Sequence, residues 1–130
     1  EGPGPGLSIP TLPDGWQYEG WAVIDGTPVS TGPFTSAIGK DDLDTFSGSN
    51  PGPNYPGEDF LNNAPAGLSF PTDLTGMTVV LSVEPSPDNS AAPFLLKPLV
   101  HNVPESAADH SVLQMSNNAE NTNPSGTVSK

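Results

Sequence analysis

Glycine and proline punctuate this chain so closely that long helices have almost no room to form. The 130 residues include 14 glycines and 17 prolines. Proline breaks the interior of a helix, and glycine costs about 1 kcal/mol there relative to alanine. The stretches between them are short and rich in β-branched and aromatic residues, which is typical of strands joined by turns. The sequence therefore predicts an all-β protein in which no helix exceeds two turns.

The clearest local pattern is a β-hairpin near the N-terminus. Residues 17–24 read QYEGWAVI, an aromatic and β-branched run that predicts a strand. Asp25 and Gly26 follow, and this pair supplies the two positive φ values of a type I′ turn. The return strand over 27–31 contains Pro28, which cannot donate a ladder hydrogen bond and so indicates a sheet edge.

Three further strands are expected. The segment 33–38 predicts a third strand around Phe34 and Ile38, and 94–100 predicts a strand late in the chain. Residues 77–84 alternate between apolar and other side chains, the most regular period-two run in the sequence, and this indicates a central strand. We expect Trp21 and Val79 in the core of an Ig-like antiparallel β-sandwich.

The sequence divides into a core and two ends. Residues 1–6 are expected to be a flexible leader, and residues 7–100 are expected to form the β-sandwich domain. Within it, residues 39–67 form a long acidic loop, much longer than most connections between elements and therefore expected to be functional or irregular. Residues 101–130 are an extended C-terminal arm, rich in asparagine and serine towards its end.

The charge of the chain excludes several kinds of partner. Fifteen acidic residues face three basic ones, giving a formal net charge of −12. Such a surface repels phosphate backbones and acidic lipids, so neither nucleic-acid binding nor membrane binding is expected. No apolar run approaches the ~20 residues that span a bilayer, and cysteine is absent. The first residues, EGPGPG, follow no methionine, and we expect a processed extracytoplasmic segment that does not insert into the membrane.

One acidic group suggests a metal site. Asp41, Asp42 and Asp44 cluster within the long loop. Calcium prefers six to eight oxygen ligands on a bendable backbone, so these carboxylates are a candidate calcium site. The spacing does not fit an EF-hand, because Phe46 stands at the fifth position counted from Asp42. The alternative is a solvated acidic loop, and no other cofactor is expected.

The sequence predicts that the protein is not an enzyme. The two histidines, His101 and His110, belong to the tail, and no nucleophile-elbow motif G-x-S-x-G occurs. The carboxylate pair Glu58 and Asp59 lies in a loop without the aromatic cleft that glycoside hydrolysis uses.

Two segments taken together resemble a known family. The chain is similar to the extracytoplasmic C-terminal domain of anti-sigma-K factors and related uncharacterised secreted bacterial proteins. The resemblance depends on a tyrosine/tryptophan strand, a tight hairpin followed by P-V-x-x-G-x-F, and a later strand ending in E-P. The matching residues are Tyr18, Trp21, Asp25, Gly26, Pro28, Val29, Gly32 and Phe34, then Val83, Glu84, Pro85 and Leu96. The resemblance implies a β-sandwich located outside the membrane.

Two functions remain open. The first is a structural or interaction module of the cell surface, whose partners are other copies of itself or other surface proteins. Short apolar patches on the two ends would add a strand to a neighbour's sheet and build a filament; they comprise Leu7, Ile9, Val112, Leu113 and Met115. The second is a sensory extracytoplasmic domain of an anti-sigma-factor-like signalling protein.

Overall fold

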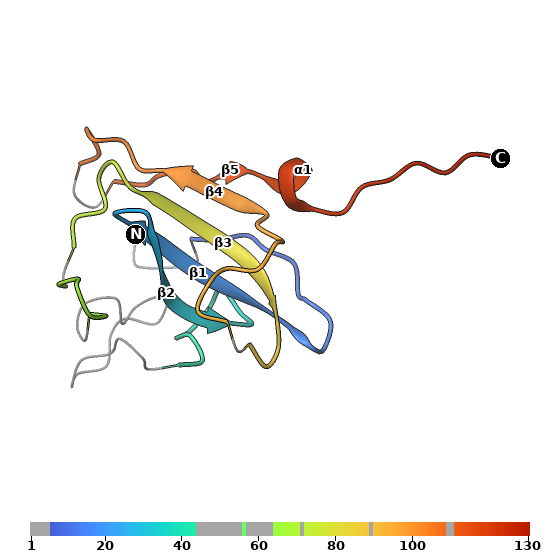
Figure 1. The fold of residues 1–130 in the computed structure, drawn as a ribbon, viewed down its shortest axis with the longest axis horizontal. Helices are drawn as coiled ribbons and strands as arrows, with labels where there is room; N and C mark the ends of the chain where they lie inside the picture. The colour runs from blue at the N-terminus through green and yellow to red at the C-terminus, as the bar shows by residue number, and fades with distance from the viewer. Residues whose placement is uncertain (1–5, 44–55, 57–63, 71, 89, 109–110) are drawn as a thin grey trace.

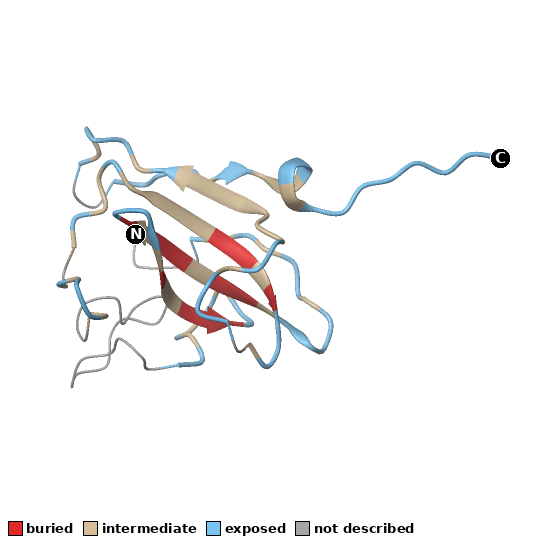
Figure 2. Ribbon diagram, in the orientation of Figure 1, coloured by how far each residue is buried: buried red, intermediate tan, exposed pale blue. Residues whose placement is uncertain are grey.

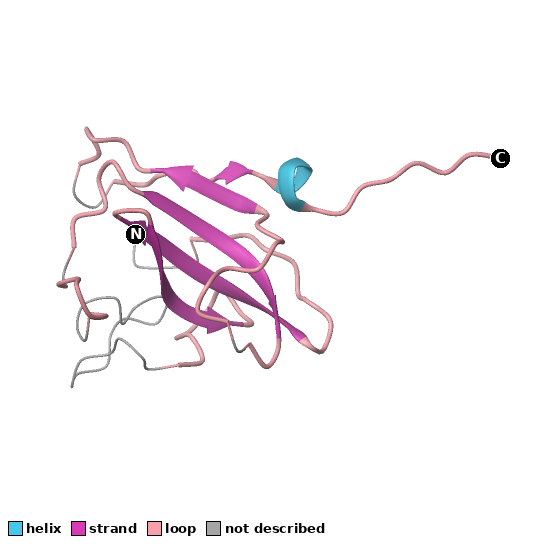
Figure 3. Ribbon diagram, viewed as in Figure 1, coloured by secondary structure: helices cyan, strands magenta, loops and turns pink. Residues whose placement is uncertain are grey.

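The chain folds around one antiparallel β-sheet (Figures 1 and 3). The structure, a computed structural model, describes residues 6–43, 56, 64–70, 72–88, 90–108 and 111–130. The elements are β1 (Trp16–Ile24), β2 (Thr27–Phe34), β3 (Thr78–Pro85), β4 (Leu99–Asn102), β5 (Ser116–Asn117) and the four-residue α1 (Ala119–Thr122). The strands lie in the order β2-β1-β3-β4-β5. The all-β prediction is confirmed, since α1 is the one helix among the described residues.

The predicted hairpin between β1 and β2 is confirmed. Ile24 pairs with Thr27 across a two-residue turn, in which Asp25 has a φ of 50° and Gly26 a φ of 81°. Both values are positive, as a type I′ turn requires. β2 is the first strand of the sheet, so Pro28 lies at an edge, as expected.

β2 does not end where the sequence indicated. The predicted break before Pro33 and the separate third strand over 33–38 are wrong, because β2 continues to Phe34 and Ile38 is 71% exposed. Glu19 pairs with Pro33 while Trp21 pairs with Ser30, so β2 contains one extra residue at this point. This extra residue forms a β-bulge, which accommodates the positive φ of Gly32, 105°. Beyond the bulge, β2 pairs with β1 again.

β3 is the central strand that the alternation predicted. It pairs with β1 along its whole length and with β4 through residues 78–81. The late strand predicted over 94–100 is shorter than expected, because β4 begins only at Leu99. Pro98 has no amide hydrogen for the ladder, yet Val83 N donates to Leu96 O at 2.8 Å, which extends the contact beyond β4.

One face of the sheet carries two apolar clusters. Tyr18, Phe34 and Leu81 form the first, with the Tyr18 and Phe34 rings stacked at 5.7 Å. The second consists of Ala22, Ile24 and Val29, and it is covered by four partly buried side chains, Leu68, Phe70, Leu74 and Met77. Figure 2 shows that the buried residues lie in β1, β2 and β3. These clusters form the core.

The opposite face is covered as well. Trp21 points away from Tyr18 along β1 and is only 2% exposed, so its predicted core position is confirmed. Val79 lies on the Tyr18 face, opposite Ala22, and is half-buried, so its predicted core position is confirmed only in part. The described residues form a single sheet, so an antiparallel β-sheet protein is established, whereas the second sheet of an Ig-like sandwich is not found within this part of the chain.

The ends of the chain contribute to this fold. Residues 7–12 carry no strand, but Leu7, Ile9 and Leu12 pack against the Tyr18 cluster. The segment 101–130, expected as an extended arm, supplies the last residues of β4, all of β5 and α1. Beyond α1 the chain leads away from the sheet (Figure 1).

The bulge gives a first testable prediction. We expect Gly32→Ala to lower the free energy of unfolding by about 1–3 kcal/mol, because φ is positive and a Cβ would lie 2.4 Å from Cγ of Asp41. Gly39→Ala is the matched control, since Gly39 has a φ of 92° but no neighbour within 4 Å of such a Cβ. Urea denaturation measures both. Equal losses for the two variants would contradict the proposed clash.

Candidate functional site

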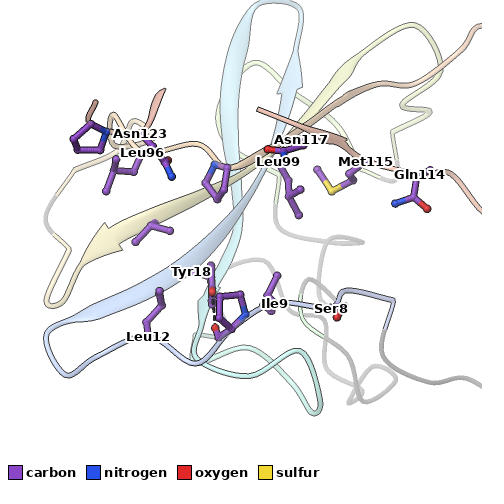
Figure 4. Close-up of a pocket in the computed structure, with 14 residues that line it drawn as sticks. Ser8, Ile9, Leu12, Tyr18, Leu96, Leu99, Gln114, Met115, Asn117 and Asn123 are labelled. Atoms are coloured by element: carbon purple, nitrogen blue, oxygen red, sulfur yellow. Dashed lines mark hydrogen bonds between the residues drawn. The ribbon is translucent and has the colours of Figure 1, made fainter. Parts of the chain in front are cut away.

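An apolar cleft lies on the Tyr18 face of the sheet, between the two ends of the chain. Its volume is about 620 Å³. Figure 4 shows Ile9 and Leu12 of the N-terminal segment on one side of it, and Leu99 and Met115 on the other. Tyr18 of β1 forms part of its floor. The cleft therefore brings together residues from the beginning, middle and end of the sequence.

The N-terminal side of the cleft is held mainly by side chains. Among the described residues, the backbone of residues 7–12 takes part in one hydrogen bond, in which the Tyr18 hydroxyl donates to Pro10 O. Burial raises the pKa of Tyr18, which keeps the hydroxyl protonated as a donor. We call residues 7–12 the N-terminal arm. Its attachment depends on apolar contacts and not on a strand ladder.

The C-terminal side is fixed by backbone pairing. Ser116 pairs with Val100 and Asn117 with Leu99, which adds β5 to the sheet. Asn118 N donates to Pro98 O at 2.7 Å, and Asn118 Nδ2 donates to Lys97 O at 2.9 Å. These bonds place the preceding Met115 against the apolar cluster.

The structure divides the five predicted interaction residues. Leu7, Ile9 and Met115 pack against the Tyr18 cluster of their own domain. Val112 is 99% exposed, and Leu113 is also exposed. The two ends thus meet at one cleft, which the sequence did not indicate, while the apolar pair before Met115 stays at the surface.

The residues predicted to bind calcium do not form a ligand cluster in the described part of the chain. Asp41 Oδ1 accepts a hydrogen bond from Leu43 N at 3.1 Å, a local turn contact. Asp42 is exposed, and Asp44 lies outside the described residues. The described residues bring a different set of acidic side chains together.

This set consists of Glu19, Glu84 and Asp88, on the Trp21 face of the sheet. Glu19 lies on β1 opposite Ser82 of β3, and Glu84 is two residues further along β3, on the same face. Asp88 belongs to the loop after β3. One carboxylate oxygen from each lies within 4.8 Å of the others, and no other such group of acidic or histidine side chains occurs among the described residues. We call these three residues the carboxylate cluster.

Hydrogen bonds fix the two buried members. Ser30 Oγ donates to Glu19 Oε1. Glu84 Oε1 accepts from Ser82 Oγ and, at 2.7 Å, from Phe94 N. Trp21 Nε1 in turn donates to Ser82 Oγ at 2.8 Å, so the indole ring supports the network. Glu19 Oε2, although buried, has no hydrogen-bond partner among the described residues.

Burial dominates the electrostatics of Glu19. It raises the pKa of this carboxyl to about 7, the Ser30 hydrogen bond opposes the rise, and the neighbouring Asp88 and Glu84 carboxyls add to it. A buried group of carboxyls can hold a proton or a cation. The sequence contained one sign of this cluster, since Glu19 stands between the aromatic residues Tyr18 and Trp21 in a strand with both faces buried.

The described residues contain no assembled catalytic dyad. His101 lies in β4 opposite Val79, on the other face from the carboxylate cluster, and His110 lies outside the described residues. The absence of enzymatic activity stays a prediction. No helix of the described residues has the length and apolar character needed to cross a membrane.

Comparisons with known proteins do not identify the chain. No family model, no curated protein and no solved structure matches it. The resemblance to the anti-sigma-K domain therefore stays an expectation.

Proposed function

We propose that this domain is a non-enzymatic, extracytoplasmic interaction module that associates with further copies of itself by exchange of the N-terminal arm. One observation supports the proposal above all. Ile9 and Leu12 line an open cleft, and together with Leu7 they are half-buried by apolar contacts with the Tyr18 cluster, while the arm has no strand ladder. An arm held in this way can leave its own cleft and fill that of a neighbour, with the same contacts made between copies.

The edges of the sheet favour arm exchange over direct pairing between sheets. β2, at one edge, contains Pro28 and Pro33, which offer no amide hydrogen to an incoming strand. β5, at the other edge, is only two residues long. Both features hinder edge-to-edge pairing, so the cleft is the better contact site.

The surface beside the cleft offers further contact area. Val112 and Leu113 are exposed three and two residues before Met115, which lines the cleft. In an exchanged assembly, we assign these two side chains to contacts with the incoming copy. Exchange from one copy to the next does not close on itself, so it builds an open filament.

The Ig-like β-sandwich belongs to this proposal as well. Burial of Tyr18 on one face and Trp21 on the other is the pattern of a sheet covered on both sides. An extracytoplasmic location agrees with the resemblance to the anti-sigma-K domain. That resemblance also supplies the alternative function, a sensory domain of a signalling protein, which would operate without self-association.

The test is the particle mass of the intact chain in sedimentation velocity over a range of concentrations. We expect particles larger than a monomer, and we expect Ile9→Asp to weaken self-association about tenfold or more, because the arm loses an apolar anchor. Thr11→Asp is the matched control, since Thr11 is exposed on the same arm. Deletion of residues 1–12 should abolish the assembly.

Two results would contradict arm exchange. The first is a monomeric intact chain at every concentration, in which case the sensory alternative takes its place. The second is an equal loss of self-association for the Ile9 and Thr11 variants, which would attribute the effect to added charge.

A further inference from the structure

The carboxylate cluster has a deficit of positive charge. Glu19 is 5% exposed and Glu84 is 1% exposed, so two of its three carboxyls have almost no contact with water. The charged groups that act on Glu19 are Asp88 and Glu84, both acidic. Burying carboxylates together without a cation is costly, and such groups are normally paired or bound to a metal ion.

The cluster also contains an oxygen that lacks a partner. Ser30 occupies Glu19 Oε1, but Glu19 Oε2 is buried without any hydrogen bond among the described residues. One oxygen of the Glu19 carboxyl lies within 4.8 Å of a carboxylate oxygen of Glu84 and of Asp88, so the group points into the cluster. Buried polar atoms in proteins are almost always satisfied, and one that faces two further carboxylates indicates a missing positive ligand.

The geometry suits a single ion. Two oxygens that bind one calcium ion at about 2.3–2.6 Å cannot be more than about 5 Å apart. The three carboxylate oxygens satisfy this condition, since they lie within 4.8 Å of one another. Oxygen is the sole donor type in the cluster, which favours a hard cation such as calcium over zinc or copper.

The residues around the carboxylate cluster leave it open to solvent, and one of its three ligands comes from a loop. Glu84 and Asp88 line an open hollow of about 520 Å³ on the protein surface, together with Phe94 and other residues of the same loop. Solvent can therefore reach the cluster, and water can complete the coordination. Asp88 is half-buried and comes from the loop, whereas Glu19 and Glu84 are fixed on neighbouring strands. An ion would connect the loop to the sheet.

We propose that Glu19, Glu84 and Asp88 bind one calcium ion between β1, β3 and the loop that follows β3. The site differs from the aspartate group that the sequence suggested. It also lies on the Trp21 face of the sheet, away from the apolar cleft, so it does not depend on arm exchange.

The experiment uses the full chain after treatment with a chelator. Addition of calcium at about 1 mM, the range of extracellular calcium modules, should raise the melting temperature by a few degrees. Isothermal titration calorimetry should give one site per chain. Glu19→Gln and Asp88→Asn should each weaken calcium binding about tenfold or more, because each removes a charged ligand. Asp42→Asn, an exposed residue of the originally predicted group, is the matched control and should leave binding unchanged.

Terbium provides a second readout that does not depend on stability. Trp21 is connected to Glu84 through Ser82, so its indole ring lies close enough to sensitise the emission of terbium bound in the cluster. We expect sensitised emission that calcium displaces and that Asp88→Asn reduces. No binding by the intact chain at millimolar calcium, calcium binding that Glu19→Gln and Asp88→Asn leave intact, or equal affinity for magnesium would each overturn the proposal.

Discussion

Replacing Trp21 by alanine is expected to lower the free energy of unfolding by about 3–5 kcal/mol. The indole ring is buried on the face of the sheet that carries the carboxylate cluster. Its Nε1 also donates to Ser82 Oγ, which donates to Glu84. The substitution therefore removes a large apolar contact and one donor of a buried network, and both losses destabilise the fold.

Two further variants separate the loss of apolar contact from the loss of the hydrogen-bond donor. Chemical denaturation measures the free energy of unfolding of all three variants. Trp21→Phe keeps much of the apolar volume but removes the donor, so an intermediate loss of about 1–3 kcal/mol is expected. Trp16→Ala is the matched control, because Trp16 is exposed at the start of β1 and contacts Phe94 with ring centroids 6.1 Å apart. A loss below about 1 kcal/mol for Trp21→Ala would place Trp21 at the surface.

The features predicted correctly from the sequence are those determined by neighbouring residues. The turn at Asp25 and Gly26 depends on two backbone angles, and residues at those positions reveal it directly. The alternation over 77–84 likewise predicted the central strand β3. The edge position of β2 was predicted from Pro28, because proline has no amide hydrogen to donate to a neighbouring strand in any context.

The features that could not be predicted depend on contacts between distant segments. Gly32 and Pro33 look like the end of a strand, but the pairing of Glu19 with Pro33 across a bulge carries β2 through them. β5 contains only Ser116 and Asn117, and its pairing with β4 has no sign in the local sequence. Propensity alone does not determine such pairing, because the partner strand supplies the hydrogen bonds.

The candidate metal site also depends on contacts between segments that are distant in the sequence. The sequence predicted a candidate calcium site in the acidic loop, because Asp41, Asp42 and Asp44 are close in sequence. The carboxylate cluster forms instead from two strands and a loop, and the register of β1 against β3 brings Glu19 and Glu84 to one face. Glu19 could have been singled out as an acidic residue in a doubly buried strand, but its partners follow only from the register.

The titration of Glu19 gives the second large expected effect. In a metal-free buffer with chelator, the free energy of unfolding should fall by about 3 kcal/mol as the pH rises from about 4.5 to 7. Burial raises the pKa of Glu19 from 4.5 to about 7, so over this interval the folded state keeps a proton that the unfolded state has released. A state that binds more protons loses stability as protons become scarce. Below pH 4.5 both states are protonated, and above pH 7 both are ionised, so the dependence is confined to this window.

Glu19→Gln isolates this effect from the general influence of a charge of −12. Glutamine imitates the protonated carboxyl, so the variant should match the parent chain near pH 4.5 and exceed its stability by about 3 kcal/mol above pH 7. Glu120→Gln, an exposed substitution in α1, is the control and should follow the parent at every pH. The groups that face Glu19 are Ser30 of β2, Glu84 of β3 and Asp88 of the following loop, and none supplies a positive charge to reverse the sign. A stability difference between the parent and Glu19→Gln that stays constant from pH 4.5 to 8 would show that Glu19 keeps its ordinary pKa in the folded protein.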